Sequence, residues 1–587
     1  MRTHTCGSLR KDDDGKSVIL CGFVHKRRDH GGLVFIDLRD RYGITQIVFD
    51  PEKGSQAHEV AHKLRSEFVI KVSGNVVARP DNMLNKNLDT GDIEIYATEL
   101  EIFSESQTTP FEIDADNLVN EELRLKHRYL DLRREKMKSN IITRHKVIKY
   151  MRDFLDSQDF LEIETPILIK GTPEGSREYI VPSRVYPGNF YVLPQSPQQL
   201  KQLLMVAGMD KYFQIARCFR DEDQRGDRQP EFTQLDMELS FVSQEDIIKI
   251  NSDLLFDILT KFRPDLSIKD NQVFTLTYDE AMNRFGSDKP DLRFDLEFKD
   301  ASSIFQNTSF NAFAGALKSG GVLKVMKVAG AAEKFSRKDI SELESVAKIY
   351  KAKGLAYISK KDGELNSPIL KFLSDLEVES LLKLTEFNEG DIMFFACDTF
   401  DIACNSLGHV RNAVAKKLNL IDESVCSIGW VTDFPMFEVN DDGSMQACHH
   451  PFTSPKKEDL EFIDTDIFRV RTNSYDLVMN GYEIAGGSVR IHERDLQAKV
   501  FDLLGISKED AKERFGHILT AFSYGVPPHA GIAWGLDRLI MILCNEPNIR
   551  EVIAFPKDQK AKDVMLGAPS KMPIDTLEEL SITIDTE

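Results

Sequence analysis

The chain has 587 residues, a mass of 66.8 kDa and a formal net charge of −20 at pH 7. Hydrophobic residues make up 41% of it and charged residues 29%, an ordinary globular composition that excludes a disordered, collagen-like or low-complexity chain. At roughly 150 residues per domain, this length predicts three or four domains.

No apolar run approaches the roughly 18 residues of a membrane span, and the N-terminal residues lack the apolar stretch of a signal peptide. The eight cysteines form no CxxC pair, which argues against a zinc ribbon or a redox motif. We therefore expect a cytoplasmic protein with buried thiols and no membrane partner.

The negative net charge does not exclude a nucleic-acid partner, because the charges are unevenly distributed. Residues 1–108 contain 15 Lys and Arg against 17 Asp and Glu, and residues 121–146 contain nine against four. A mostly acidic chain with locally basic surfaces is compatible with binding one polyanion in one orientation.

The first hundred residues contain five short apolar runs that are separated by turn residues. Runs of this kind predict strands in a small barrel, with the OB-fold as the best guess. OB-folds present aromatic and basic side chains to single-stranded nucleic acid, and Phe35 and Arg28 are candidates here. Phe35 as a core residue and the basic side chains as a solvated face remain the alternative. The predicted strands are 17–24, 33–38, 44–49, 68–73 and 92–97.

Beyond a basic segment, Ile141, Ile148, Met151 and Leu155 recur at helical spacing and predict a helix that runs to about residue 160. Pro166 then prevents helix continuation in an extended segment. From about 286 to 420 the sequence pattern changes to predicted helices and strands that are separated by glycines, which indicates an α+β insertion. Aromatic- and glycine-rich strands return after it, and the last 30 residues resemble an extended tail.

Two segments carry the most chemical information. Residues 217–232 read as strand, charged loop and strand; Arg220, at a strand end, can hold a phosphate by two N–H donors, and Phe232 can stack on a base. In residues 531–538, glycines allow close backbone approach and Arg538 begins an apolar helix. A buried arginine paired with Asp537 is the plain structural alternative for this second segment.

Together these segments resemble the three signature motifs of the class II aminoacyl-tRNA synthetases, and more narrowly the bacterial-type aspartyl-tRNA synthetases. The similarity covers nearly the whole chain, including the insertion. The strings that carry it are Thr172–Arg177, Leu193–Gln198, Phe232–Asp236, Gly481–Glu483, Gly486–His492 and Pro527–Gly531.

The resemblance implies an α+β multidomain protein whose catalytic domain is built on an antiparallel sheet. It also implies a homodimer, with the first motif helix and Pro166 at the interface. The expected domains are an OB-fold anticodon-binding barrel (1–108), a hinge (109–140), a first catalytic part (141–285), the bacterial-type insertion (286–420), a second catalytic part (421–557) and a C-terminal extension (558–587).

The implied chemistry has two steps: L-aspartate and ATP give aspartyl-adenylate and pyrophosphate, and the aspartyl group then passes to the 3′-hydroxyl of the terminal adenosine of tRNA. Arg220 and Arg538 match the catalytic arginines that hold the α- and γ-phosphates, and Asp476 and Glu483 match the carboxylates for Mg²⁺. The residues that match ATP contacts are Arg220, Asp221, Glu222, Gln229, Phe232, Glu483, Gly535, Leu536, Asp537 and Arg538.

Lys201 and Arg490 resemble the pair that holds the side-chain carboxylate of aspartate. Asparagine would leave two buried cations without a counter-charge, at a cost of roughly 3–5 kcal/mol. The pair His449-His450 matches a loop that closes over bound aspartate. The full aspartate set is Glu174, Ser196, Gln198, Lys201, Gln234, Asp236, His449 and Arg490.

For RNA, the resemblance implies stacking of Phe35 on the central anticodon base and recognition of that base's edge by Gln46. Further anticodon contacts match Arg28, His30, Arg79 and Glu94, and the acceptor-end candidates are Arg225 and Arg228. The pair His30-Gly31 resembles the pattern in members that charge both tRNA-Asp and tRNA-Asn. No DNA partner is expected.

Four alternatives stay open at this point. The enzyme could be strictly specific for tRNA-Asp, or it could be an asparaginyl or lysyl sister synthetase. A catalytically dead RNA-binding paralogue would be expected to lose Arg220, Glu483 or Arg538, and all three are present. A general single-strand binder of the OB type would leave some 450 residues unexplained.

Overall fold

The computed structural model describes residues 1–114, 119–171, 176–440 and 442–585. It divides into two compact units, Met1–Lys138 and Ser139–Glu587. Each unit is described by itself.

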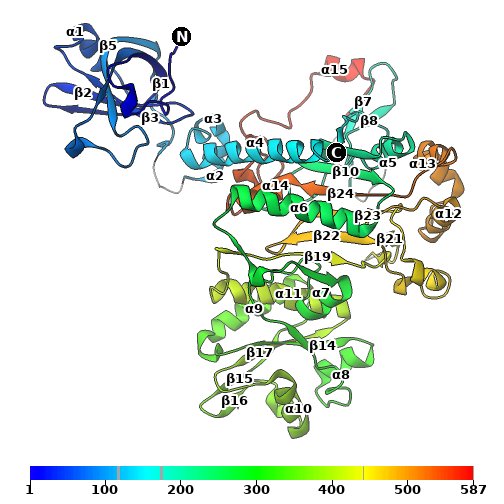
Figure 1. Ribbon diagram of the computed structural model, residues 1–587. Helices are drawn as coiled ribbons and strands as arrows, with labels where there is room; N and C mark the ends of the chain where they lie inside the picture. The colour runs from blue at the N-terminus through cyan, green and yellow to red at the C-terminus, as the bar shows by residue number, and fades with distance from the viewer. Residues whose placement is uncertain (115–118, 172–175, 441, 586–587) are drawn as a thin grey trace. The chain divides into compact units, whose positions relative to one another are not determined.

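The first unit contains a closed five-stranded barrel, so the predicted OB-type barrel is confirmed (Figure 1). On β2, Val34, Ile36 and Leu38 are buried in the barrel core, whereas the alternate residue Phe35 lies on the other face and is half-buried. The strands occur in the order β1-β2-β3-β5-β4: β1 (Ser17–His30), β2 (Leu33–Arg39), β3 (Ile44–Phe49), β4 (Val69–Ala78) and β5 (Ile93–Ser104).

Short helices α1 (Ser55–Ala61), α2 (Glu121–Lys126) and α3 (Arg128–Asp131) complete the first unit. Part of the basic segment is internal to this unit rather than available to a polyanion. Arg124 and Arg128 both donate to the fully buried carboxylate of Asp131, at 2.9 and 2.7 Å. The excess of basic residues there therefore overstates the basic surface.

The second unit is built on an eight-stranded sheet in the order β12-β19-β22-β23-β24-β10-β9-β6 (Figure 1). Its two outermost pairs are parallel and all inner pairs are antiparallel. The bounds are β6 (Leu161–Glu162), β9 (Lys211–Phe219), β10 (Glu231–Ser240), β12 (Phe274–Thr277), β19 (Ile428–Thr432), β22 (Ser474–Met479), β23 (Tyr482–Val489) and β24 (His529–Gly535).

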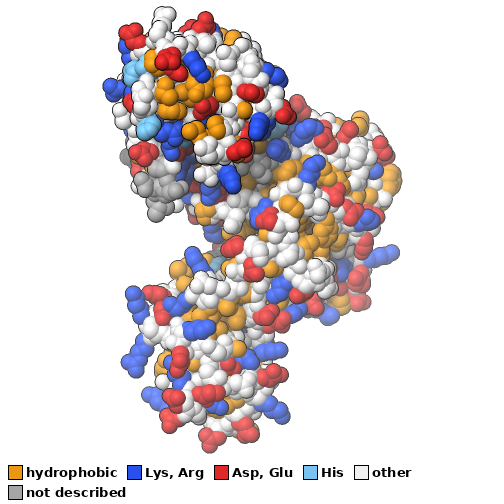
Figure 2. All heavy atoms as spheres, turned by 60° about the vertical axis from the view of Figure 1, so that its left-hand side comes forward, with side chains coloured by type: hydrophobic (Ala, Val, Ile, Leu, Met, Phe, Trp, Pro, Cys, Tyr) orange, Lys and Arg blue, Asp and Glu red, His pale blue; other side chains and the backbone are white. Residues whose placement is uncertain are grey.

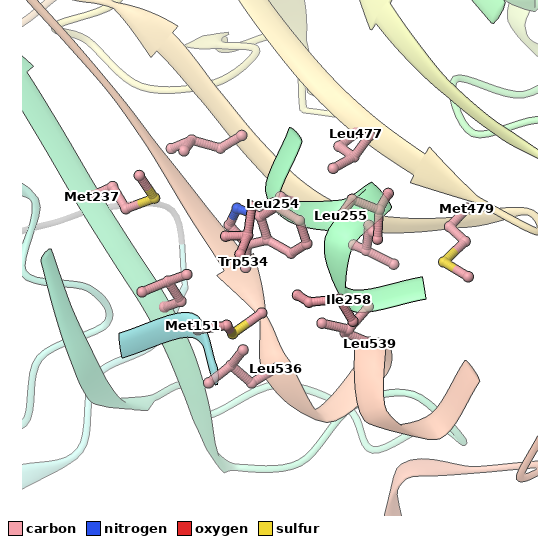
Figure 3. Packing of buried hydrophobic residues seen from close by; sticks show 14 of the residues in the cluster. Met151, Met237, Leu254, Leu255, Ile258, Leu477, Met479, Trp534, Leu536 and Leu539 are labelled. Carbon is pink, nitrogen blue, oxygen red and sulfur yellow. The ribbon is translucent and has the colours of Figure 1, made fainter. Parts of the chain in front are cut away.

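Alternation along the strands separates the core of this sheet from its polar face. On β10, Leu235, Met237 and Leu239 enter the hydrophobic core, so Gln234, Asp236 and Glu238 lie on the opposite face. Three helices cover the core face and bury their apolar sides against it (Figure 3). They are α4 (Glu135–Asp156), α6 (Gln244–Phe262) and α14 (Leu536–Leu543), so α4 ends four residues before the predicted end.

Residues 286–420 hold a separate five-stranded sheet in the order β13-β14-β17-β15-β16, packed between helices with its own hydrophobic clusters. The strands are β13 (Phe298–Asp300), β14 (Val322–Val328), β15 (Ala356–Lys361), β16 (Glu364–Asn366) and β17 (Ile392–Asp398). The helices are α8 (Asn311–Lys318), α9 (Arg337–Ile349), α10 (Asp375–Thr385) and α11 (Phe400–Lys417).

Shorter elements connect these layers. The helices are α5 (Gln198–Val206), α7 (Tyr278–Phe285), α12 (Arg494–Leu503), α13 (Lys508–Phe522) and α15 (Ile574–Glu579). The strands are β7 (Ile180–Pro182), β8 (Phe190–Val192), β11 (Ser267–Ile268), β18 (Val425–Cys426), β20 (Phe437–Val439) and β21 (Met445–Ala447).

Acidic and basic side chains are interspersed over the face drawn in Figure 2, with apolar side chains between them. Among the described residues, no helix combines the length and the hydropathy that a membrane crossing requires. All eight cysteines are free thiols.

Candidate active site

A cavity of about 630 Å³ opens over the polar face of the sheet in the second unit. Strands β10, β22, β23 and β24, helix α5 and the loop between β9 and β10 all contribute side chains to its wall. It brings together most of the predicted ligand-binding residues: Ser196, Gln198, Lys201, Arg220, Glu222, Arg228, Gln229, Phe232, Gln234, Asp236, His449, Asp476, Glu483, Arg490, Gly535, Asp537 and Arg538.

Three predicted residues stand apart from this wall, and a fourth cannot be placed. Glu174 lies outside the described residues. Asp221 and Arg225 are exposed in the loop, and the side chain of Leu536 enters the hydrophobic core, so only its backbone can face a ligand.

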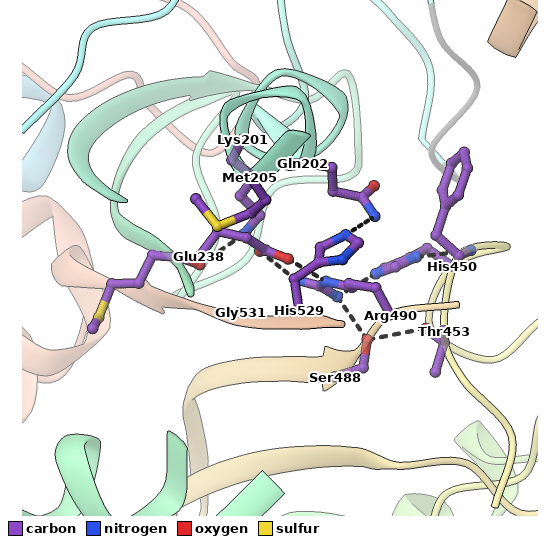
Figure 4. Close-up of polar contacts among 12 residues, drawn as sticks. Lys201, Gln202, Met205, Glu238, His450, Thr453, Ser488, Arg490, His529 and Gly531 are labelled. Carbon is purple, nitrogen blue, oxygen red and sulfur yellow. Dashed lines mark hydrogen bonds and ion pairs between the residues drawn. The ribbon is translucent and has the colours of Figure 1, made fainter. Parts of the chain in front are cut away.

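At one end of the cavity, the two predicted cations meet at a single carboxylate, that of Glu238 (Figure 4). Arg490 donates from Nε and Nη2 to the two oxygens of Glu238, at 2.9 and 3.0 Å. Lys201 Nζ lies 3.3 Å from Glu238 Oε2 and 2.7 Å from Asp236 Oδ1. All four side chains are buried, so this is a fixed cluster of two positive and two negative charges.

This cluster corrects the charge argument against asparagine. With asparagine bound, two buried cations without a counter-charge were expected, but Glu238 and Asp236 already supply one negative charge for each cation. Buried charges persist in folded proteins only when they are paired in this way. Within the described residues, Lys201 Nζ faces Asp236, Glu238 and the carbonyl oxygen of Met237, and Arg490 keeps one N–H of Nη2 for a ligand in the cavity.

The cluster shifts the pKa values of Glu238 and Asp236 in opposite directions. Burial by itself raises the pKa of Glu238, but the positive charges of Arg490 and Lys201 outweigh it and lower this pKa to about 2. Burial raises the pKa of Asp236, and neighbouring Glu238 adds to the rise. Asp236 Oδ2 is buried without a hydrogen-bond partner among the described residues, which leaves it available to a donor on a ligand.

Gly531 on β24 makes room for Glu238. A Cβ at residue 531 would lie 1.8 Å from Glu238 Oε2 and 2.4 Å from the carbonyl oxygen of Met237. Gly531→Ala is therefore expected to lower the free energy of unfolding by about 1–3 kcal/mol through overpacking, as measured by urea denaturation.

The matched control for that measurement is Gly315→Ala, in helix α8, where nothing lies within 4 Å of the added methyl group. This change should stabilise the protein by about 0.5–1 kcal/mol. Equal stability of the two variants would contradict the close packing of Glu238.

Two histidines border the cation cluster. Arg490 Nη1 lies 2.6 Å from His450 Nε2, and the backbone N–H of Phe452 points to His450 Nδ1 at 3.1 Å. Burial lowers the pKa of His450 well below its ordinary value, and burial lowers that of His449 to about 4. Both rings are therefore neutral at pH 7, and His450, which was predicted only as part of the closing loop and not as an aspartate contact, is the one that contacts Arg490.

The other end of the cavity holds two arginines from different motifs. The guanidinium of Arg220 lies over the ring of Phe232, 5.1 Å from its centroid. Arg538 donates from Nη1 to the carbonyl oxygen of Glu483 at 3.0 Å and forms an ion pair with Asp227 at 3.0 Å. Within the described residues, Arg220 makes no ion pair, so its charge is available to an anion in the cavity.

Asp537 and Gln229 use their polar atoms to hold the site together. The carboxylate of Asp537 accepts from Arg144 on α4 and from the backbone N–H of Thr233 on β10. Gln229 exchanges two hydrogen bonds with the backbone of Lys557, at 2.7 and 3.1 Å. The alternative, in which Arg538 pairs with Asp537, is therefore wrong. Asp537 and Gln229 contribute to the site by holding the walls of the cavity in place.

The predicted metal carboxylates converge beside the arginines. A Cβ at Gly486 would lie 2.7 Å from Asp476 Oδ1 and 3.2 Å from Glu483 Oε1. Burial, followed by the charges of Glu483 and Asp288, raises the pKa of Asp476 well above its ordinary value, and Asp476 Oδ1 is buried without a hydrogen-bond partner among the described residues. Oxygen donors of this kind fit Mg²⁺. No cluster of three or more potential metal ligands occurs in the described ranges, so further ligands would have to come from a nucleotide or water.

The loop between β9 and β10 folds over this end of the cavity. Arg228 Nη1 donates to Glu222 Oε2 at 2.9 Å, so these two predicted contacts are paired with each other. Arg225 is exposed on the same loop. The loop therefore presents the acidic side chain of Glu222 to the cavity and the basic side chain of Arg225 to solvent.

In the barrel of the first unit, four predicted anticodon residues form one chain of polar contacts. Arg28 Nη2 donates to Gln46 Oε1 at 3.2 Å, and Gln46 Nε2 donates to Glu94 Oε2 at 3.1 Å. Glu94 Oε2 lies 3.7 Å from Arg79 Nε. Phe35 is the cross-strand partner of Arg28 and shares its outward side, whereas His30 is exposed at the end of β1.

Sequence reasoning missed three acidic residues at the site. Glu238 follows Asp236 at the strand period of two, which places it on the same face of β10 and could have identified it. Asp227 and Asp288 line the cavity from loops, where no periodicity predicts the direction of a side chain.

Two family models match the chain: "tRNA synthetases class II (D, K and N)" over residues 120–559 and "OB-fold nucleic acid binding domain" over residues 18–103. An "Aspartate--tRNA(Asp/Asn) ligase" of Desulfatibacillum aliphaticivorans is 50% identical over 586 residues, covering 99% of this chain and 98% of the relative. The protein of the same name from Thermoanaerobacter pseudethanolicus is 51% identical over 587 residues, covering 100% and 98%.

Two solved structures have a fold similar to that of this chain. The asparaginyl-tRNA synthetase of Pyrococcus horikoshii complexed with asparaginyl-adenylate has a TM-score of 0.58 at 20% identity, covering 94% of this chain and 97% of that one. The aspartyl tRNA synthetase of Entamoeba histolytica also has a TM-score of 0.58, at 19% identity, covering 94% and 91%. These identities support the fold alone.

Proposed function

Because the chain belongs to the class II tRNA synthetases of the D, K and N group, we propose that it is an aspartate–tRNA ligase. It joins L-aspartate to ATP, releases pyrophosphate, and transfers the aspartyl group to the 3′ end of tRNA. The observation that carries this proposal is one cavity with a two-cation cluster at one end and two motif arginines at the other.

The cation cluster suits a dicarboxylic amino acid. The side-chain carboxylate of aspartate accepts a hydrogen bond from the remaining N–H of Arg490 Nη2 and is attracted by the positive charge of Lys201, and Glu238 holds both cations in place. The buried, unpartnered Asp236 Oδ2 accepts from the substrate's ammonium group. Asparagine is rejected because its amide nitrogen would face arginine and lysine, which only donate hydrogen bonds.

The two arginines and the carboxylate pair suit ATP. Adenylate formation brings the substrate's α-carboxylate to the α-phosphate, and Arg220 offsets the repulsion between these two anions. Arg538 binds the γ-phosphate, and Phe232 stacks on adenine. Asp476 and Glu483 would hold Mg²⁺, which supplies positive charge to the triphosphate when it is bound.

Two further assignments accompany this function. The enzyme acts as a homodimer, which is supported by half-exposed apolar side chains around Pro166: Leu161, Ile167 and Leu168 are 50%, 46% and 51% exposed. The reaction takes place in the cytosol, where a reducing environment suits eight free thiols.

The anticodon is bound by the outward face of the barrel. Phe35 stacks on a base, and the contact chain from Arg28 to Arg79 offers both donors and acceptors to base edges. Arg79 Nη2 is buried without a partner among the described residues, so it is a donor that RNA can satisfy. Arg225 and Arg228 contact the acceptor end.

The substrate range includes tRNA-Asn as well as tRNA-Asp, which His30-Gly31 and the names of the relatives support. Purified enzyme should attach labelled aspartate to both tRNAs. His30→Leu should lower kcat/KM for tRNA-Asn about tenfold, equivalent to about 1.4 kcal/mol, and leave tRNA-Asp within about threefold, because His30 is exposed and supports no part of the barrel.

The tRNA-Asp reaction is the internal control of that assay. Charging of tRNA-Asp alone by the unmodified enzyme would show strict specificity and end the tRNA-Asn assignment. Absence of aspartylation of either tRNA would contradict the ligase function itself.

A further inference from the structure

The arginine of the third motif is held by the loop of the second motif. Asp227 Oδ2 lies 3.0 Å from Arg538 Nη2, and the backbone oxygen of Asp227 accepts from Arg538 Nε at 3.4 Å. On its other side, Arg538 Nη1 donates to the carbonyl oxygen of Glu483 at 3.0 Å. The guanidinium is thus fixed from two directions by residues 311 and 55 positions away in sequence.

These contacts leave the arginine able to bind a phosphate. A guanidinium has five N–H donors in a rigid plane, and the contacts with Asp227 and Glu483 occupy three of them within the described residues. Two donors remain for a ligand in the cavity that Arg538 and Asp227 both line. Asp227 therefore restricts the orientation of Arg538 without filling its ligand-binding capacity.

We infer that Asp227 is a positioning residue for ATP, which orients Arg538 toward the γ-phosphate. This inference rests on the proposed function, because it requires ATP to bind at Arg538. Without Asp227, the guanidinium would keep contacts to Glu483 alone, through Nη1, and its Nε and Nη2 side would no longer be held in one orientation. Binding ATP would then have to order it, which weakens binding and misplaces the triphosphate.

The same contact couples the loop to the nucleotide. Asp227 lies next to Arg228 in sequence. Arg228 pairs with Glu222, a predicted ATP contact that lines the cavity. One ion pair thus holds the loop that contains Glu222 against the first turn of α14, which contains Arg538. Nucleotide affinity should depend on this ion pair, whereas aspartate affinity should not, because Arg490 and Lys201 have separate partners.

The test compares three variants in aspartate-dependent ATP–pyrophosphate exchange. Asp227→Ala should raise the KM for ATP about tenfold and lower kcat about tenfold, with the KM for aspartate within twofold. Asp227→Asn keeps an oxygen acceptor for Arg538 and should raise the KM for ATP by only about threefold. Asp223→Ala is the matched control, because it removes the same charge from an exposed position of the same loop outside the cavity wall.

An unchanged KM for ATP in Asp227→Ala would overturn the inference. A lower KM would do so too, because it would show that Asp227 competes with ATP. The same rise in the KM for ATP in Asp223→Ala would contradict the inference, because it would show that loss of any negative charge from the loop has this effect. Equilibrium binding of ATP by calorimetry separates this inference from the proposed function: the Asp227→Ala loss should appear there even if the unmodified enzyme shows no exchange with aspartate.

Discussion

Glu238→Gln is expected to lower kcat/KM for aspartate at least about 100-fold, or about 2.7 kcal/mol, while the KM for ATP stays within about threefold. Glu238 holds Arg490 through two hydrogen bonds and also pairs with Lys201. A glutamine would direct N–H groups at one of these cations, which only donate, so the pair would separate. Pyrophosphate exchange at varied aspartate concentration measures this effect.

The same substitution is expected to destabilise the protein by about 3–5 kcal/mol at pH 7, because it leaves two buried cations with one counter-charge. The pKa of Glu238 is about 2 in the folded protein, below its ordinary value of 4.5. Its ionised form therefore stabilises the fold above about pH 4.5, and this contribution is lost as the pH falls toward 2. Urea denaturation between pH 7 and pH 3 measures both effects.

Glu245→Gln, at an exposed position of α6, is the matched control for both experiments. It should change kcat/KM and stability by no more than the roughly 0.5 kcal/mol that is usual for surface substitutions. If Glu238→Gln behaved like this control, Glu238 would not be the common support of the two cations.

Arg220→Ala is expected to lower kcat for pyrophosphate exchange by about 10²–10³-fold, the usual effect of removing one donor that stabilises transition-state charge. Its free energy of unfolding should stay within about 0.5 kcal/mol of the unmodified protein. The reason is that Arg220 stacks on Phe232 and makes no ion pair within the described residues. Exchange kinetics and urea denaturation on one preparation check both parts.

The control for that variant is Arg217→Ala, which removes the same charge three residues earlier on β9. Arg217 pairs with Glu231 and does not line the cavity. Its kcat should stay within about threefold of the unmodified enzyme. Similar losses in both arginine variants would mean that net charge, rather than contact with the α-phosphate, explains the effect.

The barrel and the cavity could be predicted from sequence for different reasons. The barrel strands contain short apolar runs separated by turn residues, so local pattern was enough to find them, although β1, β4 and β5 extend beyond the predicted runs. The catalytic residues have no such pattern, and their assignment came from strings such as Gly486–His492 and from family resemblance. The structure then places Lys201 and Arg490 at one carboxylate although they lie 289 positions apart in sequence.

The remaining features depend on contacts that no local pattern specifies. Asp537 bonds the backbone of Thr233 across 304 residues, and Gln229 bonds the backbone of Lys557 across 328. The period of two places Glu238 on the same face of β10 as Asp236, but only the folded chain brings Lys201 and Arg490 to its carboxylate. Burial and pairing are properties of the folded chain, and they changed the explanation of how asparagine is excluded.

The most direct test of the central claim is ATP–pyrophosphate exchange by the full-length enzyme with aspartate, asparagine and lysine in parallel. We predict exchange with aspartate at a kcat/KM at least about 1000-fold above that with either other amino acid, since the cation pair directs only donors at the side chain. Comparable exchange with asparagine or lysine would contradict the assignment of Lys201, Arg490 and Glu238 as the aspartate pocket.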